Sequence, residues 1–575
     1  MTIRSELKMA FYKKRIIFAA LMLVLIRICL AEEKSETIEN ERVFKELHET
    51  ALVSAVQDQP IIPVLINRED NSVLWLNIEG GKELQAVTLD LTGTTAVSDI
   101  NNIRIFSVGH KRQSDLPDNA KLFGQIVSPK ADQQLTINGQ ADITTRGENW
   151  FLVTVTMKPE SNLSHHLDLH CSDLIVSGQP IKPEEKTQPF LRLGYRLRHQ
   201  GDDGSKGYRI PGLATSNNGT LLAIYDIRRD SKRDLQGDID IGLSRSVDGG
   251  QTWLPMQVVL DMGTYGGLPQ KYNGVSDAGI LVDRQTGRIF VFGCWMHGLR
   301  NKDGSFRNDL TENSKDWAHQ WHDGKIASGP GMTSEETAQF IMTYSDDDGQ
   351  TWLKPVNITD QVKEPQWFLF CTAPGNGFMA NDGTLVMPVQ GRDENQRAFS
   401  TIMISRDRGK TWQVGSPARL DTTESAAVQL PDGSILLNMR DNRNRKDKSE
   451  TNGRAVSVTH DWGETWNKHV SDHRADLLPE PVCMASLIRT TVNNQSILFF
   501  SNPNNCYERK NLTIKASLDE GKSWPTELHV ELDSVRGAYS CLTCVDEKNF
   551  GILYESSQGY LVFQKIQLGS FMKSL

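Results

Sequence analysis

The sequence predicts an all-β protein in which a β-propeller follows a smaller β-sandwich-like domain. A short pattern, Ser/Thr-x-Asp-x-Gly-x-Thr/Ser-Trp, recurs five times, and the copies begin 99, 60, 54 and 58 residues apart. Several short strands in repeated units of about 40–50 residues are typical of propeller blades. Before the repeats, short apolar runs alternate with polar turns, as in an antiparallel sandwich. The copies of the pattern span 246–253, 345–352, 405–412, 459–466 and 517–524.

The N-terminal 31 residues have the form of a secretory leader. A basic group, Lys13 to Arg15, precedes the apolar run 16–26, and Cys29-Leu30-Ala31 supplies a boundary of small residues. We expect segment 1–31 to be removed and the mature chain to be exported to the periplasm, the medium or the cell surface. A retained N-terminal anchor is the alternative. No later segment is apolar enough to cross a membrane, so no span is predicted in the mature chain.

The segment 32–185 carries no copy of the repeated pattern. Its runs 72–78 and 150–155 are rich in strand-forming residues and are separated by polar turns, which predicts the sandwich-like domain. The polar, proline-bounded stretch 182–189 is interpreted as a linker. The repeat region then extends from 190 to 575.

Each repeated pattern has the chemistry of a tight turn. Aspartate can accept hydrogen bonds from N–H groups two residues further on, and glycine supplies the positive φ of the turn. The tryptophan begins the outgoing strand and packs against a neighbouring unit. The aspartates are therefore interpreted as structural, and we expect them at the outer rim of the propeller. They are Asp248, Asp347, Asp407, Asp461 and Asp519.

Composition excludes several classes of function. A chain of 575 residues is too long for one ordinary domain, and a net charge of −9 argues against a nucleic-acid partner. The cysteines are scattered, and Cys541 and Cys544 are interpreted as part of a buried strand rather than a metal site. The long loop expected at 298–336 holds His319 and His322, but no third ligand accompanies them, so no metal site is predicted.

Three arginines lie beside or within apolar, strand-like segments. Arg209 stands in Gly-Tyr-Arg-Ile-Pro-Gly, Arg440 ends the run 435–439, and Arg509 precedes the run 511–514. Burying an arginine is costly unless a carboxylate pairs with it. Taken alone, each is more often a structural ion pair or an exposed residue. Together they would form a clamp for a carboxylate, whose geometry matches the guanidinium fork.

The Tyr-Arg-Ile-Pro motif followed by repeated aspartate turns resembles the sialidases (neuraminidases) with a six-bladed β-propeller. The resemblance covers 190–575, and the N-terminal segment is similar, more weakly, to the extra domain of secreted bacterial sialidases. It implies an exo-alpha-sialidase that hydrolyses terminal sialic acid from glycoproteins, glycolipids or oligosaccharides, with retention and through a tyrosyl-enzyme intermediate. No metal or organic cofactor is expected. Because five patterns serve six blades, one blade should lack the motif.

The same resemblance assigns roles to individual residues. Tyr539 would be the nucleophile, Glu424 its base and Asp234 the acid/base. From the residues alone, an ordinary strand tyrosine is the favoured interpretation of Tyr539. Arg228 would bind near O4 of the sugar together with Asp277, and Arg229 competes for the role of Arg228. The carboxylate-binding triad would be Arg209, Arg440 and Arg509.

Three alternatives stay open at the level of sequence. A trans-sialidase or an intramolecular sialidase would use the same residues with a different acceptor. A non-catalytic propeller that binds sialoglycans would keep the turns without needing the catalytic set. A propeller hydrolase that acts on neutral sugars is the third, but it would have no use for three arginines. The N-terminal domain could be a carbohydrate-binding module or a plain spacer.

Overall fold

The computed structural model describes most of the chain after residue 52. The described residues are 53–130, 134–185, 189–232, 234, 237–267, 270–296, 328–334, 336–447, 452–492 and 494–572. Within them the regular secondary structure is strand, apart from short helical turns that include α2 (Thr359–Val362) and α3 (Gly569–Met572). This confirms the all-β prediction. None of the helices in these ranges is both long and apolar enough to span a bilayer. The expected leader, His319 and His322 lie outside the described residues.

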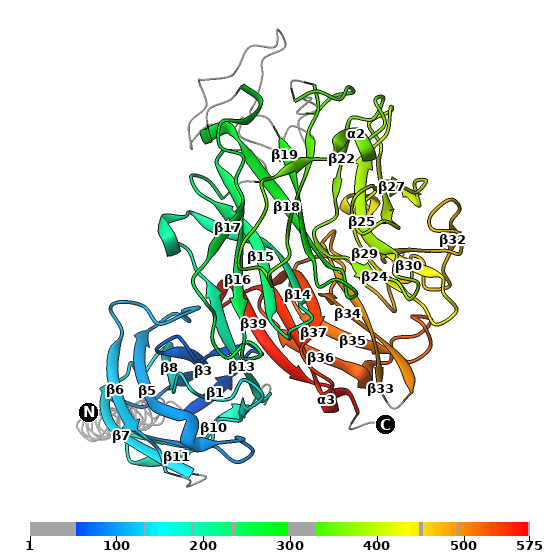
Figure 1. The fold of residues 1–575 in the computed structure, drawn as a ribbon. Coiled ribbons are helices and arrows are strands. Elements are labelled where there is room, and N and C mark those ends of the chain that lie inside the picture. The colour runs from blue at the N-terminus through cyan, green and yellow to red at the C-terminus, as the bar shows by residue number, and fades with distance from the viewer. Residues whose placement is uncertain are drawn as a thin grey trace, which may run out of the picture.

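Two sheets, antiparallel except for one parallel edge pair, pack together in the N-terminal part (Figure 1). The predicted runs 72–78 and 150–155 are confirmed as strands, and Trp75 pairs with Leu152. Alternate apolar side chains of both sheets meet in one buried cluster that includes Val87 and Ile105. The first sheet has the order β12 (Glu184–Glu185), β1 (Ser54–Asp58), β3 (Asn71–Glu79), β8 (Glu148–Met157), β5 (Ile100–Gly109), β6 (Lys121–Val127). The second has the order β11 (Gln179–Ile181), β10 (His170–Val176), β4 (Glu83–Asp90), β7 (Gln134–Asp142).

The described strands of the C-terminal part form five sheets. The largest, of nine strands, holds two antiparallel groups that are joined by one parallel pairing, between Ile239 and Gly274. Six successive antiparallel groups can therefore be distinguished. The first comprises β14 (Gly207–Thr215), β15 (Leu221–Arg228), β16 (Ile239–Ser246) and β17 (Gln257–Leu260), and the second β18 (Gly274–Val282), β19 (Ile289–Met296), β20 (Gln339–Ser345) and β21 (Val356–Asn357). The third comprises β22 (Leu369–Thr372), β24 (Phe378–Met379), β25 (Leu385–Arg392), β26 (Ala398–Ser405), β27 (Gln413–Val414) and β28 (Arg419–Leu420). The fourth comprises β29 (Thr422–Gln429), β30 (Ile435–Asp441), β31 (Ala455–Thr459) and β32 (Asn467–Lys468). The fifth comprises β33 (Ser486–Val492), β34 (Gln495–Pro503), β35 (Leu512–Ser517) and β36 (His529–Asp533). The sixth comprises β37 (Gly537–Cys544), β38 (Asn549–Ser556), β39 (Gly559–Gln567) and β13 (Leu191–Arg198).

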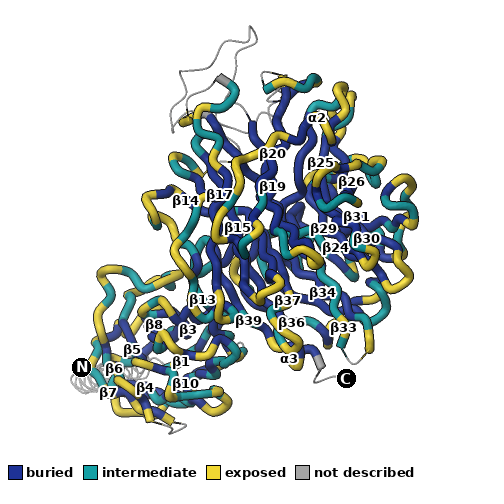
Figure 2. The backbone as a smooth tube through the Cα atoms, viewed as in Figure 1, coloured by how far each residue is buried: buried dark blue, intermediate teal, exposed yellow. Residues whose placement is uncertain are grey.

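Contacts between these groups form a closed cycle. Strand β14 contacts β18 and β37, β18 contacts β25, β25 contacts β29, and β33 contacts both β29 and β37. The sixth group joins the two ends of the region, because β13 pairs with β39 through Tyr195 and Phe563. Figure 2 shows that the strands are buried along most of their length, while exposed residues gather in the connecting turns.

The five repeated turns share one hydrogen-bond pattern. Ser246 Oγ donates to Asp248 Oδ1, and the N–H and hydroxyl of Thr252 donate to the same carboxylate. The other copies repeat these contacts. The donor therefore lies four residues after the aspartate, not two as expected. The reason is that the residue before the glycine also has a positive φ, for example 66° at Arg408, so the chain curls back further.

The turns lie at the strand ends opposite the expected functional residues. In the first group Ser246 pairs with Leu221 at one end of β15, whereas Arg228 pairs with Ile239 at the other. Each of the five copies begins at the last residue of a strand, and these strands are β16, β20, β26, β31 and β35. The sixth group has no copy of the pattern, as expected for one of six units.

The sandwich is joined closely to the sixth group. The short strands β2 (Val64–Leu65) and β9 (His166–Leu167) both pair with β13. The stretch 182–189, expected as a linker, contributes β12, which pairs in parallel with β1. Sheet pairing is favoured there because β1 would otherwise leave an open edge beside the junction.

Candidate active site

Register shifts interrupt four inner strands at equivalent places. They lie between Arg209 and Gly212 in β14, Ser276 and Gly279 in β18, Thr422 and Ser425 in β29, and Gly537 and Ser540 in β37. A bulge bends the strand locally and re-aims a side chain that would otherwise alternate with its neighbours. The shifts bracket or adjoin four predicted site residues: Arg209, Asp277, Glu424 and Tyr539.

The structure brings most of the predicted residues together in one cleft of about 490 Å³. Seven of the eight line it: Arg209, Asp234, Asp277, Glu424, Arg440, Arg509 and Tyr539. They come from strands or loops of five of the six groups, so the cleft exists only in the assembled fold.

Tyr539, Glu424 and Arg440 form a closed hydrogen-bonded set. Arg440 Nη1 donates to Glu424 Oε2 at 2.6 Å and to the Tyr539 hydroxyl oxygen at 2.9 Å, while the Tyr539 hydroxyl donates to Glu424 Oε1. All three side chains are buried. Burial, followed by the charge of Glu424, raises the pKa of the Tyr539 phenol well above its ordinary value. The phenol is therefore protonated at neutral pH, and Glu424 is placed to accept its proton.

Arg209 is held by a carboxylate that sequence reasoning missed. Its Nε and Nη2 donate to the two oxygens of Glu555 at 2.8 and 3.1 Å, a bidentate pair. The N–H of Ile210 also donates to Glu555 Oε1 at 3.2 Å. Burial opposes the charged carboxylate, but Arg209 outweighs it and lowers the pKa of Glu555 below its ordinary value. Nη1 of Arg209 stays directed toward the cleft, 3.6 Å from Asp234 Oδ1.

Arg509 completes a group of three arginines around the tyrosine. Its guanidinium carbon lies 5.6 Å from the centroid of the Tyr539 ring, and that of Arg209 lies 5.3 Å from it. Arg509 Nη2 donates to the carbonyl of Val482 at 2.7 Å. With Arg440 bonded to the hydroxyl, positive charge surrounds Tyr539, which suits an anionic ligand.

Asp234 and Arg228 form an ion pair at the mouth of the cleft. Asp234 is about half exposed, and its Oδ1 lies 2.6 Å from Arg228 Nη1. Arg228 itself is 1% exposed and does not line the cleft, because Asp226, two residues earlier on the same face of β15, binds it at 3.0 Å. In this structure Arg228 therefore supports Asp234 instead of facing the cleft. Arg229, its competitor, pairs with Asp240.

Asp277 lies in the bulge of β18, where its φ is 57°. Gln390 Nε2 donates to its Oδ2 at 3.2 Å. Burial, followed by the nearby charge of Glu424, raises the pKa of Asp277 well above its ordinary value. A protonated carboxyl at this position could donate a hydrogen bond to a ligand hydroxyl.

Two further arginines, Arg392 and Arg445, line the cleft and were not predicted. Burial and the charge of Arg440 lower the pKa of Arg445 below its ordinary value. Arg392 ends strand β25 as Arg440 ends the apolar run of β30, so the signal that identified Arg440 could have found it. The same holds for Glu555, which follows the apolar run 550–554.

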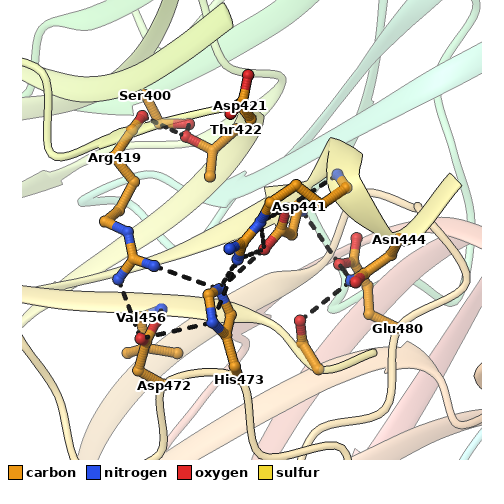
Figure 3. Close-up of polar contacts among 12 residues, drawn as sticks. Ser400, Arg419, Asp421, Thr422, Asp441, Asn444, Val456, Asp472, His473 and Glu480 are labelled. Atoms are coloured by element: carbon orange, nitrogen blue, oxygen red, sulfur yellow. Dashed lines mark hydrogen bonds and ion pairs between the residues drawn. The ribbon is translucent and has the colours of Figure 1, made fainter. Parts of the chain in front are cut away.

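A polar network fixes the chain directly after Arg440 (Figure 3). The buried carboxylate of Asp441 pairs with Arg443 and lies 2.9 Å from Nε2 of His473. Burial opposes its charge, but hydrogen bonds from Arg443 and His473 hold the pKa of Asp441 below its ordinary value.

The buried carboxylate of Glu480 connects this network to the segment that holds Arg509. It accepts the N–H of Asp441 at 3.1 Å on one oxygen and the N–H of Cys483 at 3.2 Å on the other. Asp441 follows Arg440, and Cys483 follows Val482, whose carbonyl binds Arg509. Glu480 therefore links the supports of two arginines of the cleft, and sequence reasoning missed it.

The two residues of the C-x-x-C motif differ in exposure. Cys541 is buried in β37, as predicted, but Cys544 at the end of the same strand is exposed. The expectation of a buried strand is thus wrong for Cys544, because residues three apart on a strand face opposite sides.

Comparison with known proteins identifies the family. Residues 219–552 match the BNR repeat-like domain, and 53–180 match the N-terminal domain of BNR-repeat neuraminidase. A sialidase of Bacteroides fragilis is 37% identical over 544 residues, covering 89% of this chain and 94% of the relative. The solved structure of the Hadza microbial sialidase Hz136 is 37% identical, with a TM-score of 0.80, and covers 90% of this chain and 99% of that one. The structure of an intramolecular trans-sialidase from Ruminococcus gnavus, in complex with oseltamivir carboxylate, shares the fold at 19% identity and a TM-score of 0.51, covering 65% and 98%. The chain belongs to the BNR-repeat neuraminidases, the sialidase family of glycosidases.

Proposed function

We propose that this protein is an exo-alpha-sialidase that removes terminal sialic acid from sialylated glycans, with retention and through a tyrosyl-enzyme intermediate. One observation carries the proposal. The hydroxyl of Tyr539 lies between a base, Glu424, and a cation, Arg440, while Arg209 and Arg509 approach its ring within 6 Å. A tyrosine nucleophile is the known exception to carboxylate nucleophiles among retaining glycosidases.

The arginines would bind the carboxylate of sialic acid and so orient its anomeric carbon. Arg209 is already fixed by Glu555, and Arg440 by Glu424, so little side-chain freedom is lost when the ligand binds. Orientation by such a clamp can lower the barrier substantially, because the reacting atoms are held in place before the reaction.

Tyr539 would then attack the anomeric carbon while Glu424 takes its proton. An anionic nucleophile would approach the substrate carboxylate against like charge, and a neutral phenol avoids that repulsion. The raised pKa of Tyr539 makes a base necessary, and Glu424 supplies it at hydrogen-bonding distance.

Asp234 would protonate the glycosidic oxygen as its bond to the anomeric carbon breaks. In the second half of the reaction Asp234 would take a proton from water, which attacks the anomeric carbon and breaks its bond to the Tyr539 oxygen. Glu424 would return its proton to that oxygen as it leaves. The half-exposed position of Asp234 at the mouth of the cleft supports contact with both a leaving group and water. Asp277, with Gln390, would bind hydroxyls of the sugar.

We also propose a fold for the C-terminal region and a location for the protein. The closed cycle of contacts from β14 through β37 supports a six-bladed propeller. The leader at 1–31 supports export, and sialylated glycoproteins, glycolipids or oligosaccharides would be met outside the cytoplasm.

Tyr539→Phe tests the chemistry. We expect kcat on an aryl sialoside to fall by roughly 10²–10⁴-fold, because the nucleophile is lost while the clamp remains. Affinity for a sialic acid analogue, measured by calorimetry, should change little. The control is Tyr507→Phe, at an exposed tyrosine. Turnover of Tyr539→Phe near that of the wild type would remove Tyr539 from the mechanism.

Product analysis separates hydrolysis from transfer. NMR of the wild-type reaction should show free sialic acid whose first-formed anomer has the configuration of the substrate. A new sialoside or an anhydro sugar as the main product would overturn the hydrolytic proposal, and an inverted first product would overturn retention.

A further inference from the structure

A second cleft, of about 730 Å³, adjoins the candidate active site. Arg209 and Arg509 line both clefts. The N-terminal sandwich contributes Arg68, whose Nη1 donates to Gln558 Oε1 of the sixth group at 2.9 Å. The cleft therefore lies where the sandwich meets the C-terminal strands, and its volume is in the usual range for ligand sites.

The lining of this cleft is strongly positive. Two carboxylates, Asp115 and Glu555, are already paired with Arg68 and Arg209. The other cations have no ion pair with any carboxylate in the described part of the chain. They are Arg196, Lys232, Arg509 and Arg536. Arg509 also faces the active site, so Arg196, Lys232 and Arg536 are the unpaired cations that belong to this cleft alone. A concave surface with such uncompensated positive charges focuses its potential and attracts anions.

The cleft also has an aromatic wall. Nζ of Lys232 lies 5.6 Å from the ring centroid of Tyr560, and the ring of His199 lies 6.4 Å from it. Tyr560 is partly exposed, and a ring of this kind offers an apolar face to a sugar beside the cations.

The position of Lys232 places the cleft on the leaving-group side of the active site. Arg228 Nη1 binds both the carbonyl of Lys232, at 2.8 Å, and the carboxylate of Asp234, at 2.6 Å. Lys232 and Asp234 are thus held by the same guanidinium, and we refer to their backbone as this turn. A sugar attached to the oxygen that Asp234 protonates would leave past this turn, and the side chain of Lys232 lines the second cleft.

We propose that this cleft binds an anionic group on the leaving part of the substrate, a carboxylate of a second acidic sugar or a sulfate ester. The inference rests on the proposed sialidase function and adds a preference to it. Glycans that carry a second negative charge next to the terminal sialic acid would be cleaved faster than neutral ones. Through Arg68 the sandwich would take part in substrate choice.

The test compares substrates whose leaving parts carry different charges. They are sialyllactose, its sulfated form, disialyl-lactose and a small neutral aryl sialoside. The variant Arg196→Gln/Arg536→Gln removes two unpaired charges of the cleft and leaves the proposed catalytic residues intact. Arg146→Gln, at an exposed arginine of the sandwich outside both clefts, is the control for loss of charge.

We expect wild-type kcat/KM to be about tenfold higher for at least one charged substrate than for sialyllactose, with the advantage falling as salt is added. The double variant should lose most of this advantage, and its kcat/KM on the aryl sialoside should stay within about twofold of the wild type. Arg146→Gln should behave as the wild type. A preference for disialyl-lactose identifies a carboxylate, and one for the sulfated substrate identifies a sulfate ester.

Equal rates on charged and neutral substrates would overturn the inference, as would an equal loss on all substrates in the double variant. Failure of the proposed sialidase function would give a different result from failure of this inference. In that case the wild type would not cleave even the aryl sialoside.

Discussion

Glu555 shows how single residues prepare the site before any ligand is bound. Its bidentate contact holds Arg209 in one orientation, and its contact to the N–H of Ile210 fixes the bulge that presents this arginine. The lowered pKa of Glu555 means that this contact persists in mildly acidic conditions.

Glu555→Gln should make the protein less stable by roughly 2 kcal/mol at neutral pH, since the charge of Arg209 loses its partner. A carboxylate whose pKa is lowered by folding stabilises the fold above its ordinary pKa, here 4.5, and loses that contribution as pH falls below it. The difference in Tm between wild type and variant should therefore be constant above pH 4.5 and shrink below it. A difference that grows on acidification would contradict this account.

Substitution of Glu480 should weaken binding of the substrate while the proposed catalytic residues stay unchanged. Glu480→Gln keeps the size of the side chain but weakens the contacts that place Asp441 and Cys483. We expect KM and the inhibition constant of a sialic acid analogue to rise several-fold, with kcat less affected, because Arg440 and Arg509 are less well positioned. An analogue whose carboxylate is replaced by an alcohol should show a much smaller change. Equal losses for both analogues would indicate a general structural effect.

Some residues that line the cleft carry a signal in the sequence, a charged side chain that interrupts or ends an apolar strand. Arg209 and Arg440 were found in this way, and resemblance to a known family added Tyr539, which has no such signal. Glu480 could not be predicted, because it lies in an irregular segment and its partners are brought together only by folding. They are two backbone N–H groups and the side chains of Asn444 and Arg454. The burial of Arg228 depended likewise on Asp226 and Asp234, whose contacts no spacing reveals.

Among the elements, the repeated turns are rigid connectors that stand apart from the chemistry. Their aspartates satisfy the backbone of the turn, and the glycine has a positive φ in every copy. The motif was enough to predict a tight turn and its strand partners. It did not reveal that a non-glycine residue such as Arg408 or Glu520 also has a positive φ. The residue type gives no sign of this, because the hydrogen bonds of the turn hold the backbone in that conformation.

Gly409→Ala should destabilise the fold without changing catalysis. The φ of Gly409 is 78°, and an added Cβ would lie 2.4 Å from Cζ of Phe290. Gly433→Ala is the matched control, since its φ is 90° but nothing lies within 4 Å of the added atom. Urea unfolding should show a loss of about 1 kcal/mol for the control and more for Gly409→Ala. Both should keep wild-type kcat/KM, and a large loss in either would link the turns to the site.

At the scale of the molecule, the sandwich and the propeller-like region share apolar packing. Ile66 and Leu167 of the N-terminal part belong to one buried cluster with Leu193, Tyr208 and Phe563. Sequence alone suggested two domains joined by a polar linker, because composition describes each segment separately. Pairing of β2 and β9 with β13 is a long-range contact and leaves no mark in the spacing of residues.

Because the two parts share one apolar cluster, calorimetry should show a single cooperative unfolding transition in which the sandwich and the C-terminal region unfold together. Leu167→Ala, at a fully buried position of the shared cluster, should lower the whole transition, at a cost of about 2–4 kcal/mol. Leu122→Ala, at an exposed leucine of the sandwich, should leave it unchanged. Two well-separated transitions would show that the parts unfold independently.

The four bulges have a consequence for how such a site can diverge. Successive side chains of a strand point to opposite faces of the sheet, so the number of residues in a strand decides which side chains face the cleft. This holds for the four bulged strands, β14, β18, β29 and β37. Removing one residue at a bulge would restore regular alternation and turn the following side chains to the opposite face. Substitutions can therefore accumulate along these strands while length is held constant, and gain or loss of residues is confined to the turns at their ends. A lineage that altered this count would lose the geometry of the cleft even with every functional residue still present in its sequence.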